Sequence, residues 1–177
     1  MKKTIYAVVF LALLFSSCAN EFNKVYKSTD NNFKYEYAKE CFAKGKYVRA
    51  STLLQGLVTM QKGSDNAQES LYMLGMSEFN SRDYEGASAT FKKYCQSYPK
   101  GSYTEEARFL IGMSLYNCTP EPRLDQSQTV NAITAFQEYI DLYPDGKQKK
   151  DAQQRLFELQ DKLVQKELYS EIGRAHV

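Results

Sequence analysis

The chain has 177 residues, of which 43% are hydrophobic and 25% are charged, the ordinary composition of a folded domain rather than of a disordered or collagenous chain. Its one histidine, His176, leaves no histidine pair for a metal site, and the formal net charge of +2 is too small for a nucleic-acid-binding surface. With 14 tyrosines and 10 phenylalanines, the chain offers more contact surface than catalytic chemistry.

Residues 1–17 have the composition of an export signal. Two lysines precede an apolar run over residues 5–15, which as a helix would span about 16 Å, roughly half of a bilayer core. Small residues follow, as they do before a cleavage site. The run is therefore expected to direct export and not to cross a membrane.

The end of this signal resembles that of bacterial lipoproteins. The stretch Leu14-Phe15-Ser16-Ser17-Cys18 carries the resemblance, although Phe15 stands where leucine is commonest. The resemblance implies cleavage before Cys18, lipidation of Cys18, and an outer-membrane address, because Ala19 and not aspartate follows. An ordinary cleavable signal with an incidental cysteine is the alternative. Residues 19–32 are polar and contain four asparagines, so residues 18–32 are expected to form a lipidated cysteine and a flexible tether of about 20 Å.

Residues 33–171 contain an internal repeat. Gly75-Met76-Ser77 recurs 37 residues later at 112–114, and Tyr98-Pro99-Lys100-Gly101 recurs 45 residues later at 143–146. The difference of eight predicts an insertion in the third unit, at the segment 118–127 with its two prolines. The resulting units cover about 33–63, 66–101 and 103–146, and a fourth begins over 147–171.

Each unit is predicted to be a pair of helices. The first helix has a small residue at its middle, the second has an alanine, and a large apolar residue follows one turn later; these are Ala38, Ala50 and Leu54, then Gly75, Ala87 and Phe91, then Gly112, Ala132 and Phe136. Small residues let two helices approach closely. Pro99 and Pro144 should end the second helices, glycines should allow the turns after them, and Ser102 with Glu105 should form a capping box.

This pattern resembles the tetratricopeptide repeat. The predicted fold is accordingly all-α, an α-solenoid of tetratricopeptide-like helix pairs, with a longer helix over Lys147 to Ser170. The last residues, 172–177, break the helical pattern and resemble one translated frame of a common sequencing adapter. We therefore expect the native sequence to depart from this chain after Glu171, which leaves the solenoid C-terminally truncated; a genuine C-terminus is the alternative.

The first helices carry aromatic and methionine side chains at positions that share one helical face. Counted from the small residue, these positions lie three residues before, one after and four after it. The peptide-groove candidates at these positions are Tyr35, Phe42, Tyr72, Met76, Phe79, Phe109, Met113 and Tyr116. Such an inner surface suits a peptide with apolar side chains. Packing of the same rings against the neighbouring repeat is the alternative.

No pattern in the chain predicts catalysis, a metal site or a cofactor. Cys41, Cys95 and Cys118 lack metal-binding spacing, and the adjacent carboxylates of Glu105 and Glu106 cannot share a helical face. A basic cluster follows the third unit and consists of Lys147, Lys149 and Lys150. The cluster is either a solvated face or a docking patch for an acidic partner.

The order of lipoprotein cysteine, tandem repeats, proline-containing insertion and long helix resembles the BamD-like (YfiO) family of outer-membrane assembly lipoproteins. Its more specific stretches here are Tyr98-Pro99-x-Gly101, Asp125-Gln126-Ser127-Gln128-Thr129 and Lys166-Glu167-x-Tyr169. The resemblance implies a non-enzymatic, periplasm-facing scaffold, lipid-anchored in the outer membrane, that binds a BamA-like barrel insertase, accessory lipoproteins and unfolded β-barrel substrates. The alternatives are another repeat lipoprotein or periplasmic module for envelope constriction or nutrient uptake, and the solenoid part of a truncated cell-wall lytic enzyme.

Overall fold

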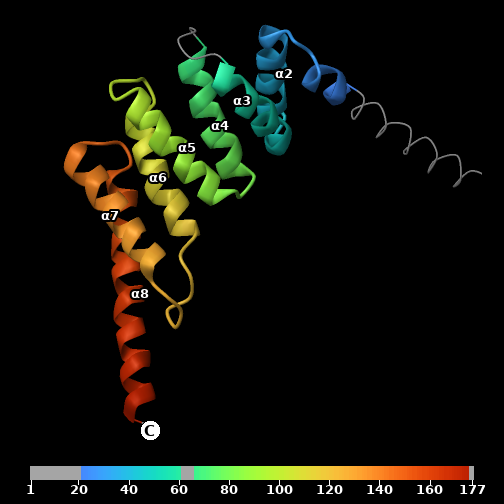
Figure 1. Ribbon diagram of the computed structural model, residues 1–177. Helices are drawn as coiled ribbons and strands as arrows, with labels where there is room; N and C mark the ends of the chain where they lie inside the picture. Colours follow the sequence, from blue (N-terminus) through green and yellow to red (C-terminus); the bar gives the residue numbers. More distant parts are fainter. Residues whose placement is uncertain (1–20, 61–65, 176–177) are drawn as a thin grey trace, which may run out of the picture.

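A computed structural model describes residues 21–60 and 66–175 of the chain (Figure 1). Within these ranges there is no strand, and successive helices lie side by side as a stack of pairs. The labelled helices are α2 (Asn31–Ala43), α3 (Tyr47–Met60), α4 (Ala67–Asn80), α5 (Tyr84–Ser97), α6 (Thr104–Asn117), α7 (Ser127–Leu142) and α8 (Lys149–Ala175). The predicted all-α solenoid of repeated helix pairs is confirmed.

Close contact between the two helices of a unit depends on the small residue of the first helix. A Cβ atom built on Gly75 would lie 2.7 Å from the Phe91 ring, and one on Gly112 would lie 2.7 Å from the Phe136 ring. Both phenylalanines are fully buried, so neither ring can swing into solvent. The predicted pairing of a small residue with a large one therefore sets the distance between α4 and α5 and between α6 and α7.

A buried tyrosine hydroxyl joins the second unit to the start of the third. The Tyr94 hydroxyl accepts hydrogen bonds from Gln68 Nε2 at 2.7 Å and from the backbone N–H of Tyr103 at 3.2 Å. A Cβ on Gly101 would lie 2.6 Å from this hydroxyl, and Gly101 does not have a positive φ. The glycine expected for turn flexibility instead makes room for what we call the tyrosine latch.

A second tyrosine latch lies 45 residues later, and its contacts show that one prediction is wrong. The Tyr139 hydroxyl accepts from the backbone N–H of Gln148 at 3.2 Å and donates to Glu105 Oε1 at 3.3 Å. The same carboxylate oxygen accepts from the backbone N–H of Lys147 at 2.9 Å. The capping box predicted for Ser102 and Glu105 is wrong: α6 begins without a side-chain cap, because Glu105 binds donors across the unit boundary.

The N-terminal segment differs from the flexible tether expected over residues 19–32. Residues 21–26 are helical, and Val25 is fully buried among apolar residues of α2 and α3. Phe22 packs against the same cluster, and the Arg49 guanidinium lies 5.5 Å from the centroid of its ring. The spacing of Phe22 and Val25 on one helical face explains the folding, which the surrounding asparagines obscured in the sequence.

The predicted insertion is an irregular segment over residues 118–126 that packs beside α8. Gln126 is buried in it, donates to the backbone carbonyl of Leu124 at 3.2 Å, and accepts from the Thr129 hydroxyl at 2.6 Å. From α8, Lys166 Nζ donates to the same Leu124 carbonyl at 2.6 Å. The prolines thus mark a loop with a fixed internal structure.

Helix α8 continues through Ala175, so the predicted break of the helix after Glu171 is wrong; a single glycine in a helix costs only about 1 kcal/mol. Its beginning follows the repeat register, with Ala152 and Leu159 fully buried. Its other face exposes large apolar side chains, which are Phe157 (71% exposed), Val164 (66%), Leu168 (56%) and Ile172 (46%). The helix extends past the rest of the stack (Figure 1).

We expect Gly112→Ala to lower the free energy of unfolding by about 1–3 kcal/mol, because the added methyl group must displace the Phe136 ring. Gly56→Ala is the matched control: Gly56 lies inside α3, and a methyl group added there would have no other atom within 4 Å, so alanine should stabilise the fold by up to about 1 kcal/mol. Chemical denaturation measures both. Equal effects of the two substitutions would contradict the close-approach argument.

Candidate functional site

A cavity of about 350 Å³ lies where α2 and α4 present their predicted aromatic positions. Three of the groove candidates line it together: Phe42 from α2, and Tyr72 and Met76 from α4. The remaining lining residues are Lys39, Glu69, Met73 and Tyr103. We call this space the α2–α4 cavity. Its lining combines apolar side chains with one acidic and one basic group.

Stacked tyrosines form one wall of the cavity. The rings of Tyr72 and Tyr103 are nearly parallel, with centroids 4.2 Å apart and an interplanar angle of 10°. Tyr94 packs edge-on against Tyr72 at 5.8 Å. Burial is the main cause that raises the pKa of Tyr72, and the nearby carboxylate of Glu106 raises it further, so the hydroxyl stays neutral. Because the latch of Tyr94 holds the backbone of Tyr103, the wall is built jointly by the second and third units.

Tyr35, another groove candidate, is 3% exposed and lies among the buried residues of the first unit. Burial and the Glu69 carboxylate raise the pKa of Tyr35, and its hydroxyl makes no hydrogen bond of regular geometry within the described ranges. The Lys39 ammonium lies 5.2 Å from the Tyr35 ring centroid and 3.7 Å from a Glu36 carboxylate oxygen. Lys39 and Glu69 therefore place one positive and one negative charge beside the apolar lining of the cavity.

Phe79 occupies the repeat position of Phe42 but does not line the cavity. Both rings make the same local contact. Phe42 packs edge-on against Tyr47 at 5.5 Å, and Phe79 packs edge-on against Tyr84 at 5.4 Å. Phe42 thus lines the cavity and Phe79 does not, although both rings pack edge-on against a tyrosine in the same way.

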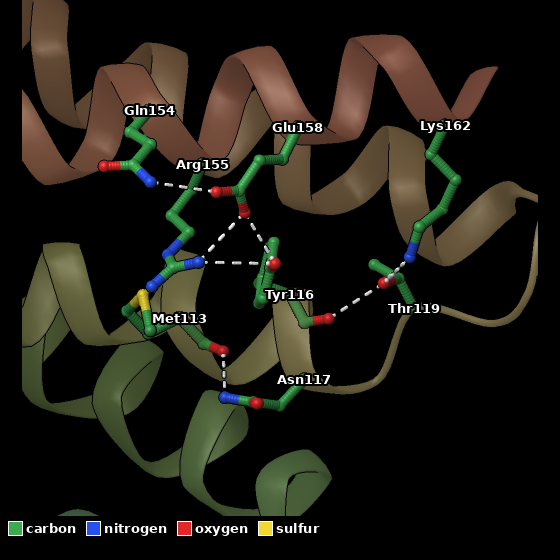
Figure 2. A network of polar contacts seen from close by, with 8 residues as sticks. All are labelled: Met113, Tyr116, Asn117, Thr119, Gln154, Arg155, Glu158 and Lys162. Carbon is green, nitrogen blue, oxygen red and sulfur yellow. Dashed lines mark hydrogen bonds and ion pairs between the residues drawn. The ribbon is translucent and has the colours of Figure 1, made fainter. Parts of the chain in front are cut away.

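Two members of the third set, Met113 and Tyr116, lie beside α8 (Figure 2). The Tyr116 hydroxyl donates to Glu158 Oε2 at 2.7 Å, and a guanidinium nitrogen of Arg155 donates to the same oxygen at 2.9 Å. The guanidinium also lies 5.0 Å from the Tyr116 ring centroid, and Figure 2 shows the Met113 side chain beside the guanidinium. Hydrogen bonds from Tyr116 and Arg155 lower the pKa of Glu158.

Phe109 also packs internally, with its ring centroid 5.6 Å from that of Tyr139 and 6.0 Å from that of Phe136. The structure therefore gathers Phe42, Tyr72 and Met76 of the first two sets around one cavity, whereas Met113 and Tyr116 of the third set lie beside α8. The repeat pattern did not indicate the Arg155 and Glu158 pair, because the pair has no counterpart in the other units. A search for opposite charges at i and i+3 on the predicted long helix would have found it.

The basic cluster lies at the turn between α7 and α8. Lys149 Nζ donates to the backbone carbonyl of Pro144 at 2.6 Å, while Lys147 and Lys150 are exposed.

Burial raises the pKa of the Cys41 and Cys95 thiols, and these cysteines and Cys118 are free. Residues 21–60 and 66–175 contain no group of histidine, cysteine and carboxylate side chains that could hold a metal ion. In the same ranges, no helix is both long enough and apolar enough to cross a bilayer.

Comparison with known proteins gives a family match over most of the chain. The model of the family YfiO, described as outer membrane lipoprotein, matches residues 27–172. The outer membrane protein assembly factor BamD of Caulobacter vibrioides (strain ATCC 19089 / CIP 103742 / CB 15) is 22% identical over 171 residues, which cover 95% of this chain and 55% of that protein. The chain thus spans about half the length of this relative.

Glu158→Gln should lower the free energy of unfolding at neutral pH by up to about 1 kcal/mol, because the Arg155 ion pair is lost at a partly exposed site. The folded-state pKa of Glu158 is lowered, so the carboxylate stabilises the fold above its unfolded pKa and ceases to do so as the pH falls through the folded value. Denaturation curves should therefore separate wild type from variant at neutral pH and converge in acid. A difference that persists in strong acid would contradict this assignment.

Proposed function

The chain belongs to the YfiO family of outer membrane lipoproteins, and from this premise we propose that it is a non-enzymatic scaffold of the machinery that assembles β-barrel proteins in the outer membrane. The family match over residues 27–172 carries the proposal. It is supported by the assembly-factor name of the Caulobacter relative. A stack of helix pairs, which supplies extended contact surface, suits such a role.

The anchor in this proposal is Cys18, lipidated after removal of residues 1–17, with the solenoid facing the periplasm. Cys18 lies outside the described residues, and the support for its role is the sequence that precedes it. Several acyl chains on one residue hold a protein stably at a membrane. A lipid anchor of this kind agrees with the family description of outer membrane lipoprotein.

The α2–α4 cavity is the proposed binding site for unfolded barrel substrates. Strands of such barrels alternate apolar with polar residues and carry aromatic residues near their ends. An aromatic side chain could enter between Phe42, Tyr72 and Met76, and burial of such a side chain contributes about 1.5–3 kcal/mol. Lys39 and Glu69 could meet a charged terminus or polar groups of the same segment. Tyr35 would support this site from the core below it.

The C-terminal part is the proposed contact with the barrel insertase and accessory lipoproteins. Its support is the exposed pair Lys147 and Lys150 together with the apolar face of α8. In this scheme, residues 147–171 begin a fourth unit whose apolar face consists of Phe157, Val164 and Leu168, and residues 172–177, Ile172 among them, are foreign to the native protein. Arg155 and Glu158 would hold α8 against the third unit and so keep this surface in place.

Depletion of the protein from its host should lower the levels of outer-membrane β-barrel proteins generally, because all of them would share one assembly route. An intact copy should restore them, whereas a Cys18→Ala copy should not, because it lacks the anchor. Quantitative proteomics of isolated outer membranes provides the measurement. Loss of a single transport system with the other barrels unchanged would contradict the proposed function.

Phe42→Ala should weaken binding of an apolar peptide that ends in phenylalanine about ten-fold or more, because it removes a wall of the cavity. Phe79→Ala is the matched control, since that ring makes an equivalent contact with a tyrosine outside the cavity. Fluorescence anisotropy of a labelled peptide gives the affinities, and denaturation gives the stabilities. A similar loss of binding in both variants would show that stability, not the cavity, determines peptide binding.

A further inference from the structure

Residues 21–27, which we call the docked segment, precede the first unit and pack against its two helices. Val25 has no exposed surface, and the Phe22 ring lies between this core and the Arg49 guanidinium. The rings of Phe22 and Tyr26 stack with their centroids 6.1 Å apart. The Lys27 backbone N–H donates to the Asn23 carbonyl at 3.2 Å and so extends the helical turn. The segment is therefore fixed on α2 and α3.

The place of this segment in the sequence limits the distance between the anchor and the first unit. Glu21 follows Cys18 by only three residues, and an extended chain spans at most about 3.6 Å per residue, which gives about 11 Å. A flexible tether over residues 19–32 would have spanned about 20 Å and let the solenoid turn freely. This step rests on the anchoring of Cys18 that belongs to the proposed function.

The outer side of the docked segment carries groups that suit a phospholipid surface. Lys24 and Lys27 are exposed and form no ion pair within the described part of the chain. Tyr26 is 52% exposed, and Phe33, at the start of α2, is 43% exposed. Lysines are attracted to lipid phosphates, and aromatic residues are enriched at the level of the headgroups.

We propose that the docked segment and the start of α2 lie against the phospholipid headgroups and hold the first unit at the membrane surface. Lys24 and Lys27 meet the phosphates, and Tyr26 lies at the boundary between the headgroups and the acyl chains. The buried Val25 transmits the position of the anchor to the solenoid, because the segment cannot swing while that side chain remains in the core.

The test uses the full chain attached at Cys18 to vesicles of phosphatidylethanolamine with a minority of phosphatidylglycerol. Where the protein carries no lipid, Cys18 is coupled to a maleimide-headgroup lipid in a Cys118→Ser background, so the result does not depend on lipidation in cells. A genetically encoded fluorescent residue replaces Asn32 on α2 or, as the control, Lys93 on α5; both positions are exposed. A quencher on the lipid headgroups should reduce emission at position 32 by about two-fold or more and leave position 93 nearly unchanged. Equal quenching at both positions, or none at position 32, would overturn the proposal and leave this face to a protein partner.

Variants of the docked segment test whether this segment causes the quenching at position 32. Val25→Asp should release the segment and reduce quenching at position 32, whereas Val130→Asp on α7, where the valine is 50% exposed, should not. Circular dichroism verifies that both remain helical. Because Val25→Asp also disturbs the core, the double variant Lys24→Glu and Lys27→Glu changes only exposed charges, and it should reduce quenching as well. Unchanged quenching in both segment variants would overturn the proposed surface without bearing on barrel assembly.

Discussion

The contact between a glycine on one helix and a phenylalanine on the next determines most of this structure. At Gly75 and Gly112 the approach leaves no space for a methyl group, so α4 and α6 lie at a fixed distance from their partners. The tyrosine latch then sets where the following unit begins. One consequence is the α2–α4 cavity, since the latch of Tyr94 holds the backbone beside the ring that stacks on Tyr72. The binding surface thus follows from the packing of the repeat.

The periodicity of the sequence is sufficient to predict the fold because it records helix contacts. Registers of 37 and 45 residues identify the small and large residues that meet, and also the loop with two prolines. The tyrosine latch crosses unit boundaries in the same register, with Gln68 and Glu105 at equivalent positions, but the different residue types hide this equivalence in the sequence. Local spacing predicts that Glu105 caps its own helix, but the side chain binds groups of the next unit. Glu78 shows the same limit: it occupies the register of Cys41 and Leu115, yet it is a buried carboxyl whose pKa is raised by burial.

The candidate site is predictable in composition and less so in extent. Phe42 on α2, together with Tyr72 and Met76 on α4, lines one cavity from the predicted face of each helix. Of their third-unit counterparts, Tyr116 is bonded to α8 through Arg155 and Glu158, and Met113 lies beside Arg155, as Figure 2 shows. Phe109 keeps the ring contacts that Tyr72 makes with the following helix, whereas Tyr116 and Phe42 have different neighbours although their repeat positions agree. Which side chains surround a ring such as Tyr116 depends on the element that comes after its unit, and that information is not contained in the repeat itself.

Site-specific photo-crosslinking in living cells tests the central claim, that the α2–α4 cavity receives unfolded barrel proteins, most directly. A photoreactive residue at Met76 lies in the cavity, and one at Met113 occupies the equivalent position beneath α8. We predict that position 76 captures newly exported β-barrel proteins and that position 113 does not. Equal capture at both positions, or capture at position 76 of other classes of protein alone, would contradict the claim.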